Sequence, residues 1–457
     1  MTDPTACDAY FAACRDSILS DWFELLRIPT VGSDIRHLGD CARCTAWLRR
    51  WLRPLGFDVE VETAGGMPLL LAVREGAPSA PTVLFYGHYD VQPADPLEAW
   101  ESPPFEPVLR DDGRVYARGA QDNKGQFFGF LQGLRFLVES GRRLPAVKLV
   151  LEGEEESGSA SLVKLLPELR RRLGAQVLMA CDTGVAPDGR PAIVAGLRGV
   201  IHLTATVSGA PRDLHSGTHG GVAPNPAQAL ARMLASMHGD DGRILVDGFA
   251  PARPPTAEER ALAAASAISD DAYEAATGVA PSGGEAAAHP AWERAGFRPT
   301  IEVNGIHGGY GGPASKTIIP SRAFAKLSAR LVPGQSPHEC VEAISRHLEA
   351  RCPAGLRLEI GEVQPPGGAL RLPVASPLCR IAADVLAELD PRGPVFQWCG
   401  ASIPVIAGLA EASGAAPLLV GFGTEADRVH APNESYSLDQ FRQTMRYAAG
   451  MLAALAG

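Results

Sequence analysis

The sequence lacks several features that would place a chain of 457 residues in a special class. It has no run of about 18 apolar residues, so we expect no membrane-spanning helix and no membrane partner. It has no basic excess, because 42 lysines and arginines stand against 52 acidic residues, for a formal charge of −10. Proteins that bind nucleic acid usually carry basic patches, so no nucleic-acid partner is expected. No internal repeat is evident either, which argues against a solenoid.

The apolar core of a signal peptide is missing from the first fifteen residues. The nine cysteines are an odd number scattered along the chain, which favours reduced thiols and a cytoplasmic location. Cys41 and Cys44 have the spacing of a metal or redox pair. They lie in a helical pattern without a second pair, so packing is favoured over a zinc or redox role.

The composition that remains is that of a globular protein, with 46% hydrophobic and 21% charged residues. The chain is too long for one ordinary core, and this favours two domains. Apolar periodicity predicts an alternation of helices and strands in the first part of the chain. The expected helices are 8–26, 38–54, 123–139 and 159–172, and the expected strands are 58–63, 68–74, 82–86, 146–152 and 176–181.

The pattern changes near Gly199 and changes back near residue 365. Apart from an Ala-rich helical stretch at 257–278, the middle part predicts a β-α-β-β-α-β order. Its expected elements are strands 200–208, 299–304, 322–332 and 355–361 and helices 226–238 and 336–350. We therefore predict an α/β fold in which a catalytic domain, 1–198 and 365–457, has a central mixed sheet flanked by helices. An α+β lid or dimerisation domain, 199–364, is inserted into it.

Five separated segments carry side chains that bind metal ions. Two histidines and several carboxylates form the mixed ligand set that can hold a pair of zinc-like ions for hydrolysis. The apolar strand 82–86 ends just before the first of them, where open α/β sheets bind ligands. The segments are His88-Tyr-Asp90, Asp122, Glu154-Glu155-Glu156, Asp182 and His430-Ala-Pro-Asn.

Each segment alone also has a plain structural explanation. His88 can be a satisfied histidine at a capped strand end, and Asp122 can be an ordinary helix N-cap. The glutamate run can be a solvated loop at a helix start, where the helix dipole favours anions. Adjacent glutamates diverge in direction, however, so one can bind metal while its neighbour handles the proton of a water molecule. Asp90 can be a ligand or the carboxylate that orients His88.

In this order the segments resemble the dinuclear zinc peptidase family of carboxypeptidase G, aminoacylase, succinyl-diaminopimelate desuccinylase and the carnosinase-type dipeptidases. The resemblance covers nearly the whole chain. It implies two divalent ions per chain, with zinc expected and manganese or cobalt as alternatives. The implied ligands are His88 and Asp182 on one ion, Glu156 and His430 on the other, and Asp122 bridging. The implied general base is Glu155, with Asp90 behind His88.

Further motifs resemble the dipeptidase branch. Asp213-Leu-His215-Ser-Gly resembles a lid motif whose histidine reaches the partner's active site, which implies a homodimer formed through the lid domain. Arg330 matches a residue that pairs with the substrate carboxylate, and its guanidinium suits that task. Ser402 and Asn304 are further candidates for substrate binding. The run from Trp398 to Ser402 is less polar than in many relatives, and Asn123 stands where Asp is common.

The function predicted from these residues is a metal-dependent hydrolase that cleaves the amide bond of dipeptides or small peptides with a free C-terminal carboxylate. A deacylase or desuccinylase acting on N-acyl amino acids is an alternative on the same metal centre. A non-catalytic binding protein of the same fold is a third alternative, since fold does not fix function. The chain retains matches for all five ligands and for Glu155, which favours an enzyme.

Overall fold

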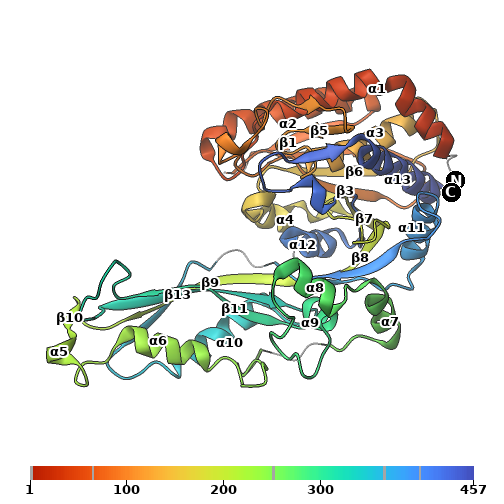
Figure 1. Cartoon of the computed structure of the whole chain (residues 1–457). Helices are drawn as coiled ribbons and strands as arrows, with labels where there is room; N and C mark the ends of the chain where they lie inside the picture. Colours follow the sequence, from red (N-terminus) through yellow and green to blue (C-terminus); the bar gives the residue numbers. More distant parts are fainter. Residues whose placement is uncertain (1–3, 64–65, 250–252, 364–366, 401–402) are drawn as a thin grey trace. The chain divides into compact units, whose positions relative to one another are not determined.

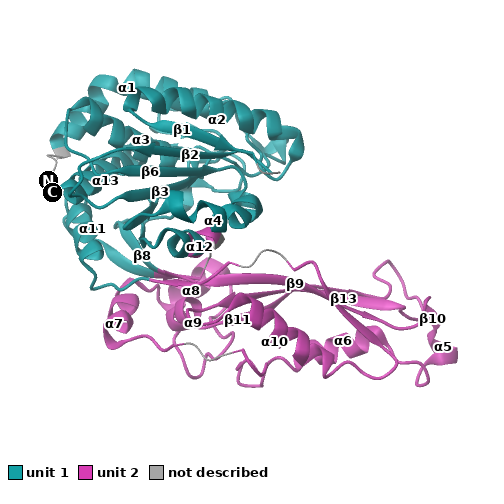
Figure 2. Ribbon diagram, turned by 180° about the vertical axis from the view of Figure 1, so that it is seen from behind, with its two compact units in different colours: residues 1–195, 372–397, 408–457 teal, residues 196–371, 398–407 magenta. Residues whose placement is uncertain are grey.

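The computed structural model describes residues 4–63, 66–249, 253–363, 367–400 and 403–457. The chain divides into two compact units (Figure 2). Unit 1 comprises residues 1–195, 372–397 and 408–457, and unit 2 comprises residues 196–371 and 398–407. Unit 1 is therefore discontinuous. The segment 398–407 belongs to unit 2, although the sequence placed it in the catalytic domain.

Unit 1 is built on a mixed sheet whose strand order is β1-β2-β6-β3-β7-β17-β8 (Figure 1). The centre of the sheet is parallel, because β3 pairs in parallel with both β6 and β7, and β17 pairs in parallel with β7. All six residues of β3 are buried, as a continuously apolar central strand requires. The strands are β1 (Asp58–Glu62), β2 (Leu69–Arg74), β3 (Val83–His88), β6 (Val147–Glu152), β7 (Val177–Ala180), β8 (Ala192–Leu197) and β17 (Ala416–Leu419).

Helices flank this sheet and share its core. Helix α3 packs closely against α13, since a Cβ atom on Gly133 would lie 2.4 Å from the carbonyl oxygen of Met445. Helix α1 packs against both (Figure 1). The helices of this part are α1 (Pro4–Leu26), α2 (Leu38–Leu52), α3 (Lys124–Glu139), α4 (Ala160–Leu173), α11 (Pro377–Ala387) and α13 (Leu438–Ala456), and α12 (Pro404–Ser413) crosses the unit boundary.

A small three-stranded sheet in unit 1 joins two distant parts of the chain. Strand β18 (Ser435–Ser437) pairs with β5 (Arg114–Tyr116), which also pairs with β4 (Val108–Leu109). The pairing places the segment that follows His430 beside the segment that precedes Asp122. Neither β5 nor β18 was expected from the sequence, because each has only three residues.

Unit 2 has a four-stranded antiparallel sheet of order β11-β13-β9-β14 with helices α6 and α10 packed on it. These elements are β9 (Gly199–Ser208), α6 (Pro226–Ala235), β11 (Thr300–Gly308), β13 (Arg322–Leu331), α10 (Pro337–Glu349) and β14 (Arg357–Gly361). The smaller elements are β10 (Leu214–His215), α5 (Ser216–His219), α7 (Ala257–Ser266), α8 (Asp270–Thr277), α9 (Ala291–Phe297), β12 (Ile318–Ile319) and β15 (Leu370–Arg371), and β16 (Val395–Cys399) crosses the boundary.

The α/β prediction with a central mixed sheet is confirmed, and the long elements lie where periodicity placed them. The helical stretch expected near 257–278 is present, and it consists of two helices. The break falls where the Ser269 side chain accepts a hydrogen bond from the backbone N–H of Ala272 and so caps the second helix. No helix among the described residues is long and apolar enough to cross a membrane.

The nine cysteines are all free in the structure. Cys41 and Cys44 lie on α2 with no exposed surface. Burial raises the pKa of both thiols to about 12, so both carry their protons at neutral pH. Buried, protonated thiols behave as small apolar groups that pack in the core.

Candidate metal centre

Parallel pairing brings three of the predicted segments to one edge of the sheet in unit 1. His88 is the last residue of β3, and Asp182 follows the end of β7 by two residues. The glutamate run follows β6, which pairs with β3 on the other side. Asp122 lies just before α3, which packs on β3. The carboxyl ends of neighbouring parallel strands meet at one edge, and this explains why residues far apart in sequence converge here.

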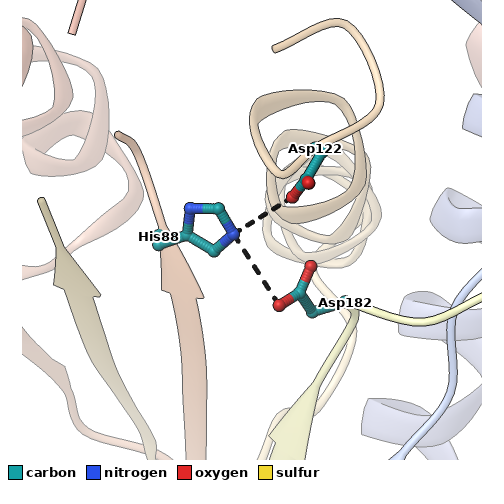
Figure 3. Close-up of side chains that lie close together, drawn as sticks. All are labelled: His88, Asp122 and Asp182. Carbon is teal, nitrogen blue, oxygen red and sulfur yellow. Dashed lines mark ion pairs between the residues drawn. The ribbon is translucent and has the colours of Figure 1, made fainter. Parts of the chain in front are cut away.

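The first cluster, here called the His88 triad, consists of His88, Asp122 and Asp182 (Figure 3). His88 Nε2 lies 3.2 Å from Asp122 Oδ1 and 3.7 Å from Asp182 Oδ2. The side chain of His88 is only 1% exposed, and its buried Nε2 has no hydrogen-bond partner. On the other side of the ring, Nδ1 lies 3.3 Å from Asp90 Oδ1. A buried imidazole nitrogen facing two carboxylates is well placed to bind a cation.

The second cluster, the His430 triad, consists of Asp122, Glu156 and His430. His430 Nε2 lies 2.8 Å from Asp122 Oδ2 and 3.2 Å from Glu156 Oε2. Asp122 thus directs one oxygen toward each histidine, as a bridging ligand would. Unlike His88, the side chain of His430 is 52% exposed, and its backbone is left-handed at φ 62°. It lies on the loop between η5 (Glu425–Asp427) and β18.

The pKa values around the triads reflect carboxylate crowding. Burial acts to lower the pKa of His88, but Asp182, Asp122 and Asp90 raise it well above its usual value. Hydrogen bonds to Asp122 and Glu156 raise the pKa of His430 to about 10. Burial acts to raise the pKa of Asp122, but His430 and His88 have the larger effect, and the pKa of Asp122 is lowered overall. The site therefore stabilises positive charge, and this property together with imidazole and carboxylate ligands fits a pair of divalent ions.

Asp90 organises the glutamate run as well as His88. Its carboxylate accepts hydrogen bonds from the backbone N–H of Glu155 at 3.3 Å and of Glu156 at 3.1 Å. Glu155 Oε2 then lies 4.0 Å from His88 Nε2. Burial, followed by the nearby carboxylates, raises the pKa of Glu155 well above its usual value, although His88 opposes the rise.

Glu154 points elsewhere, because its carboxylate accepts hydrogen bonds from the backbone N–H of Met67 at 2.9 Å and of Ser161 at 2.8 Å. Ser161 lies in the first turn of α4, so Glu154 satisfies a free N–H group at the helix start. Within this run Glu154 therefore supports a helix start, while Glu155 lies near His88 and Glu156 lies near His430.

Three further residues support the triads; Gln92 and Glu434 were not singled out from the sequence, and Asn123 was noted there only as standing where Asp is common. Gln92 Nε2 donates to Glu156 Oε2 at 2.7 Å, and Asn123 Nδ2 donates to Asp182 Oδ1 at 2.8 Å. Glu434 accepts a hydrogen bond from the backbone N–H of Asp122 at 3.0 Å. A signal existed for Gln92, because it continues the alternation of His88 and Asp90 along an extended segment. Glu434 could not be found in this way, since its partners are more than 300 residues away.

The predicted lid and substrate residues belong to unit 2, so their roles at the metal centre remain predictions. His215 is exposed at the end of β10, and its Nδ1 accepts a hydrogen bond from the N–H of Gly217 at 3.0 Å. Asn304 is exposed on β11, and Arg330 is half-buried on β13. Burial lowers the pKa of Arg330. Ser402 lies outside the described residues.

Comparison with known proteins gives an independent view of the chain. A family model described as peptidase family M20/M25/M40 matches residues 84–454. The Cys-Gly metallodipeptidase DUG1 of Saccharomyces cerevisiae is 29% identical over 471 residues, which cover 96% of each chain. The β-Ala-His dipeptidase of Rattus norvegicus is 33% identical over 291 residues, which cover 62% of this chain and only 58% of that protein.

Solved structures give the same result for the fold. The M20 family metallo-carboxypeptidase Sso-CP2 from Sulfolobus solfataricus superimposes with a TM-score of 0.84 at 29% identity. The match covers 96% of this chain and 99% of that one. The likeness therefore includes residues of both units.

Proposed function

The chain belongs to peptidase family M20/M25/M40, and on that basis we propose that it is a metal-dependent dipeptidase. The observation that carries the proposal is the pair of triads that share Asp122, with Glu155 beside them and close to His88. The relatives described as Cys-Gly and β-Ala-His dipeptidases support a substrate of two residues with a free carboxylate. The two ions are zinc in this proposal, with manganese and cobalt as substitutes.

The residues of the centre then have distinct tasks. Divalent ions held by the triads would polarise the scissile carbonyl and lower the pKa of a bound water. Glu155 accepts the proton of the attacking water and delivers it to the nitrogen of the leaving amine. Asp90 fixes the ring of His88 through Nδ1, which leaves Nε2 as the ligand atom. It also fixes the turn that directs Glu155 and Glu156 toward the centre.

Residues of unit 2 complete the proposed reaction. Arg330 pairs with the substrate carboxylate, with Asn304 and Ser402 lining the same pocket. His215 of a partner subunit stabilises the oxyanion, a donor of a kind that contributes on the order of 3 kcal/mol in other hydrolases. This requires a two-fold dimer through unit 2. The family resemblance supports these roles.

Peptide length separates the two peptidase activities that relatives suggest. Carboxypeptidase activity on longer peptides is the second candidate function, because the structure of the metallo-carboxypeptidase Sso-CP2 matches this one over nearly its whole length. A dipeptidase should cleave Cys-Gly or β-Ala-His much faster than a tripeptide that ends in the same residue. A carboxypeptidase should cleave both. N-acetyl amino acids test the deacylase alternative in the same assay.

The decisive experiment is hydrolysis of this substrate set by protein that has first been stripped of metal and then reloaded with zinc, manganese or cobalt. We expect activity only after reloading, with two ions per chain by elemental analysis. A fully active preparation without metal would overturn the proposal. A protein that binds two ions but hydrolyses none of the substrates would instead be a binding protein of this family.

A further inference from the structure

A buried carboxylate links two of the three segments that form the His430 triad, those that carry Asp122 and His430. Glu434 has no exposed surface and lies four residues after His430. Its Oε1 accepts hydrogen bonds from the backbone N–H of Gln121 at 2.9 Å and of Asp122 at 3.0 Å. Its Oε2 accepts from the backbone N–H of Gly119 at 3.0 Å and from Arg118 Nη1 at 2.7 Å.

All four partners are donors, which only a carboxylate without its proton can satisfy. Burial raises the pKa of Glu434, and the guanidinium of Arg118 opposes that rise. Arg118 is itself 1% exposed, so the pair is fully removed from water. Placing two charges in the interior is costly unless their hydrogen bonds are satisfied. Three of the four hydrogen bonds to Glu434 come from backbone N–H groups of the segment 119–122, so the carboxylate holds this backbone as well as the charge of Arg118.

Other hydrogen bonds also hold the loop that carries His430, since the N–H of Ala431 donates to the carbonyl of Arg428 at 3.0 Å and the N–H of Ala117 donates to the carbonyl of Glu434 at 3.1 Å. His430 and Asn433 both have left-handed backbones, at φ 62° and 63°. Asn433 anchors the loop on one side, since its Oδ1 accepts from the N–H of Glu101 and its Nδ2 donates to the carbonyl of Ala99. Glu434 anchors it on the other side, directly to the residue that provides the shared ligand.

We propose that Glu434 is a positioning residue, a role that rests on the proposed function. It sets the separation of Asp122 and His430 and thereby the affinity of the His430 triad for its ion. The hydrogen bonds of the Glu434 side chain go to backbone N–H groups and to Arg118, and not to the ligand atoms of either triad. It acts through the N–H of Asp122 and through the short chain segment that leads back to His430. The His88 triad shares Asp122 but is otherwise carried by strand ends, so it should depend on Glu434 less.

The test is Glu434→Gln, which keeps the size of the side chain but has only one acceptor oxygen and places an amide donor against N–H groups. Affinity of each triad is measured by titrating metal-free protein with Zn²⁺ against a chromophoric chelator, and the visible spectrum of the Co²⁺ form reports ligand geometry. In Glu434→Gln we expect the Zn²⁺ affinity of the His430 triad, the weaker of the two sites, to fall by about tenfold to a hundredfold. This is the usual loss when a group that orients metal ligands is removed. The Co²⁺ spectrum should change, and the Zn²⁺ affinity of the His88 triad, the tighter site, should change less.

Asp427→Asn is a matched control on the same return segment. Asp427 is also fully buried and also accepts four hydrogen bonds, from Arg114, Gln440 and the backbone and side chain of Thr424. None of these donors belongs to a predicted ligand. We expect this variant to lose thermal stability while both Zn²⁺ affinities and the Co²⁺ spectrum stay as in the parent.

The outcomes are distinct. If Glu434→Gln loses stability as Asp427→Asn does and keeps the parental Zn²⁺ affinities and Co²⁺ spectrum, Glu434 is only part of the core and the inference is wrong. If Glu434→Gln does not fold, Glu434→Asp is measured instead, because it keeps the charge beside Arg118 but is one carbon too short to reach the N–H of Asp122. Parent protein that binds no Zn²⁺ would overturn the proposed function itself, which is a separate result.

Discussion

The two triads have the same ligand chemistry but different supports. His88 lies at the end of a fully buried strand, and Asp182 follows the neighbouring parallel strand. His430 lies on a loop with a left-handed backbone and is half exposed. The His88 triad is therefore a product of the sheet, and the His430 triad depends on hydrogen bonds between loops. Equal ligands do not imply equal sites, because affinity also depends on what holds the ligands in place.

Removing both ions should have the largest effect and should also separate the triads. Dialysis against a chelator is expected to abolish hydrolysis, with the ion of the exposed His430 triad leaving before the ion of the buried His88 triad. Metal content and activity measured on the same samples check this. Loss of both ions in one step would contradict the difference between the triads.

Glu155→Gln should have the next largest effect. The amide keeps the size of the side chain but cannot accept the proton of water, so turnover should fall by at least about a hundredfold. Neither triad includes Glu155, and metal content should therefore stay at the parental value. Steady-state kinetics and elemental analysis check both statements. A variant that loses an ion together with its activity would show that Glu155 is a ligand.

Exchange of each histidine for alanine compares the triads directly. His88→Ala removes a buried side chain from between three carboxylates and should destabilise the metal-free protein by about 2 kcal/mol. His430→Ala changes a half-exposed residue and should alter that stability by less than about 0.5 kcal/mol while the affinity of its triad falls. Urea unfolding of metal-free protein checks the first quantity. Equal stability losses would remove the distinction between sheet and loop.

The smallest expected effects come from the side chains that orient one carboxylate in each triad. Gln92→Ala removes the hydrogen bond to Glu156 and should weaken the His430 triad by about tenfold. Asn123→Ala removes the hydrogen bond to Asp182 and should weaken the His88 triad by a similar factor. Zn²⁺ titration should show weaker binding at the His430 triad in Gln92→Ala and weaker binding at the His88 triad in Asn123→Ala. A change in the same triad for both would mean that the centre responds as one unit.

Local patterns in the sequence were enough for the long elements and for the candidate ligands. The apolar strand that ends in His88, the strand that leads to the glutamate run and the helix after Asp122 are all present. The short strands β5 and β18 were missed, because three residues carry too little periodicity to recognise. Roles within the glutamate run came from the family resemblance, and the geometry shows Glu154 bound to a helix start.

By itself, the sequence determined which residue types are available and on which elements they lie, because periodicity and motif spacing are properties of neighbouring residues. It determined the α/β class and the set of candidate ligands. Only the tertiary structure decided which oxygen of Asp122 lies near His88 and which lies near His430, and that Glu434 holds the loops between them. The physical reason is distance along the chain: a hydrogen bond between residues 312 positions apart depends on how the whole unit packs.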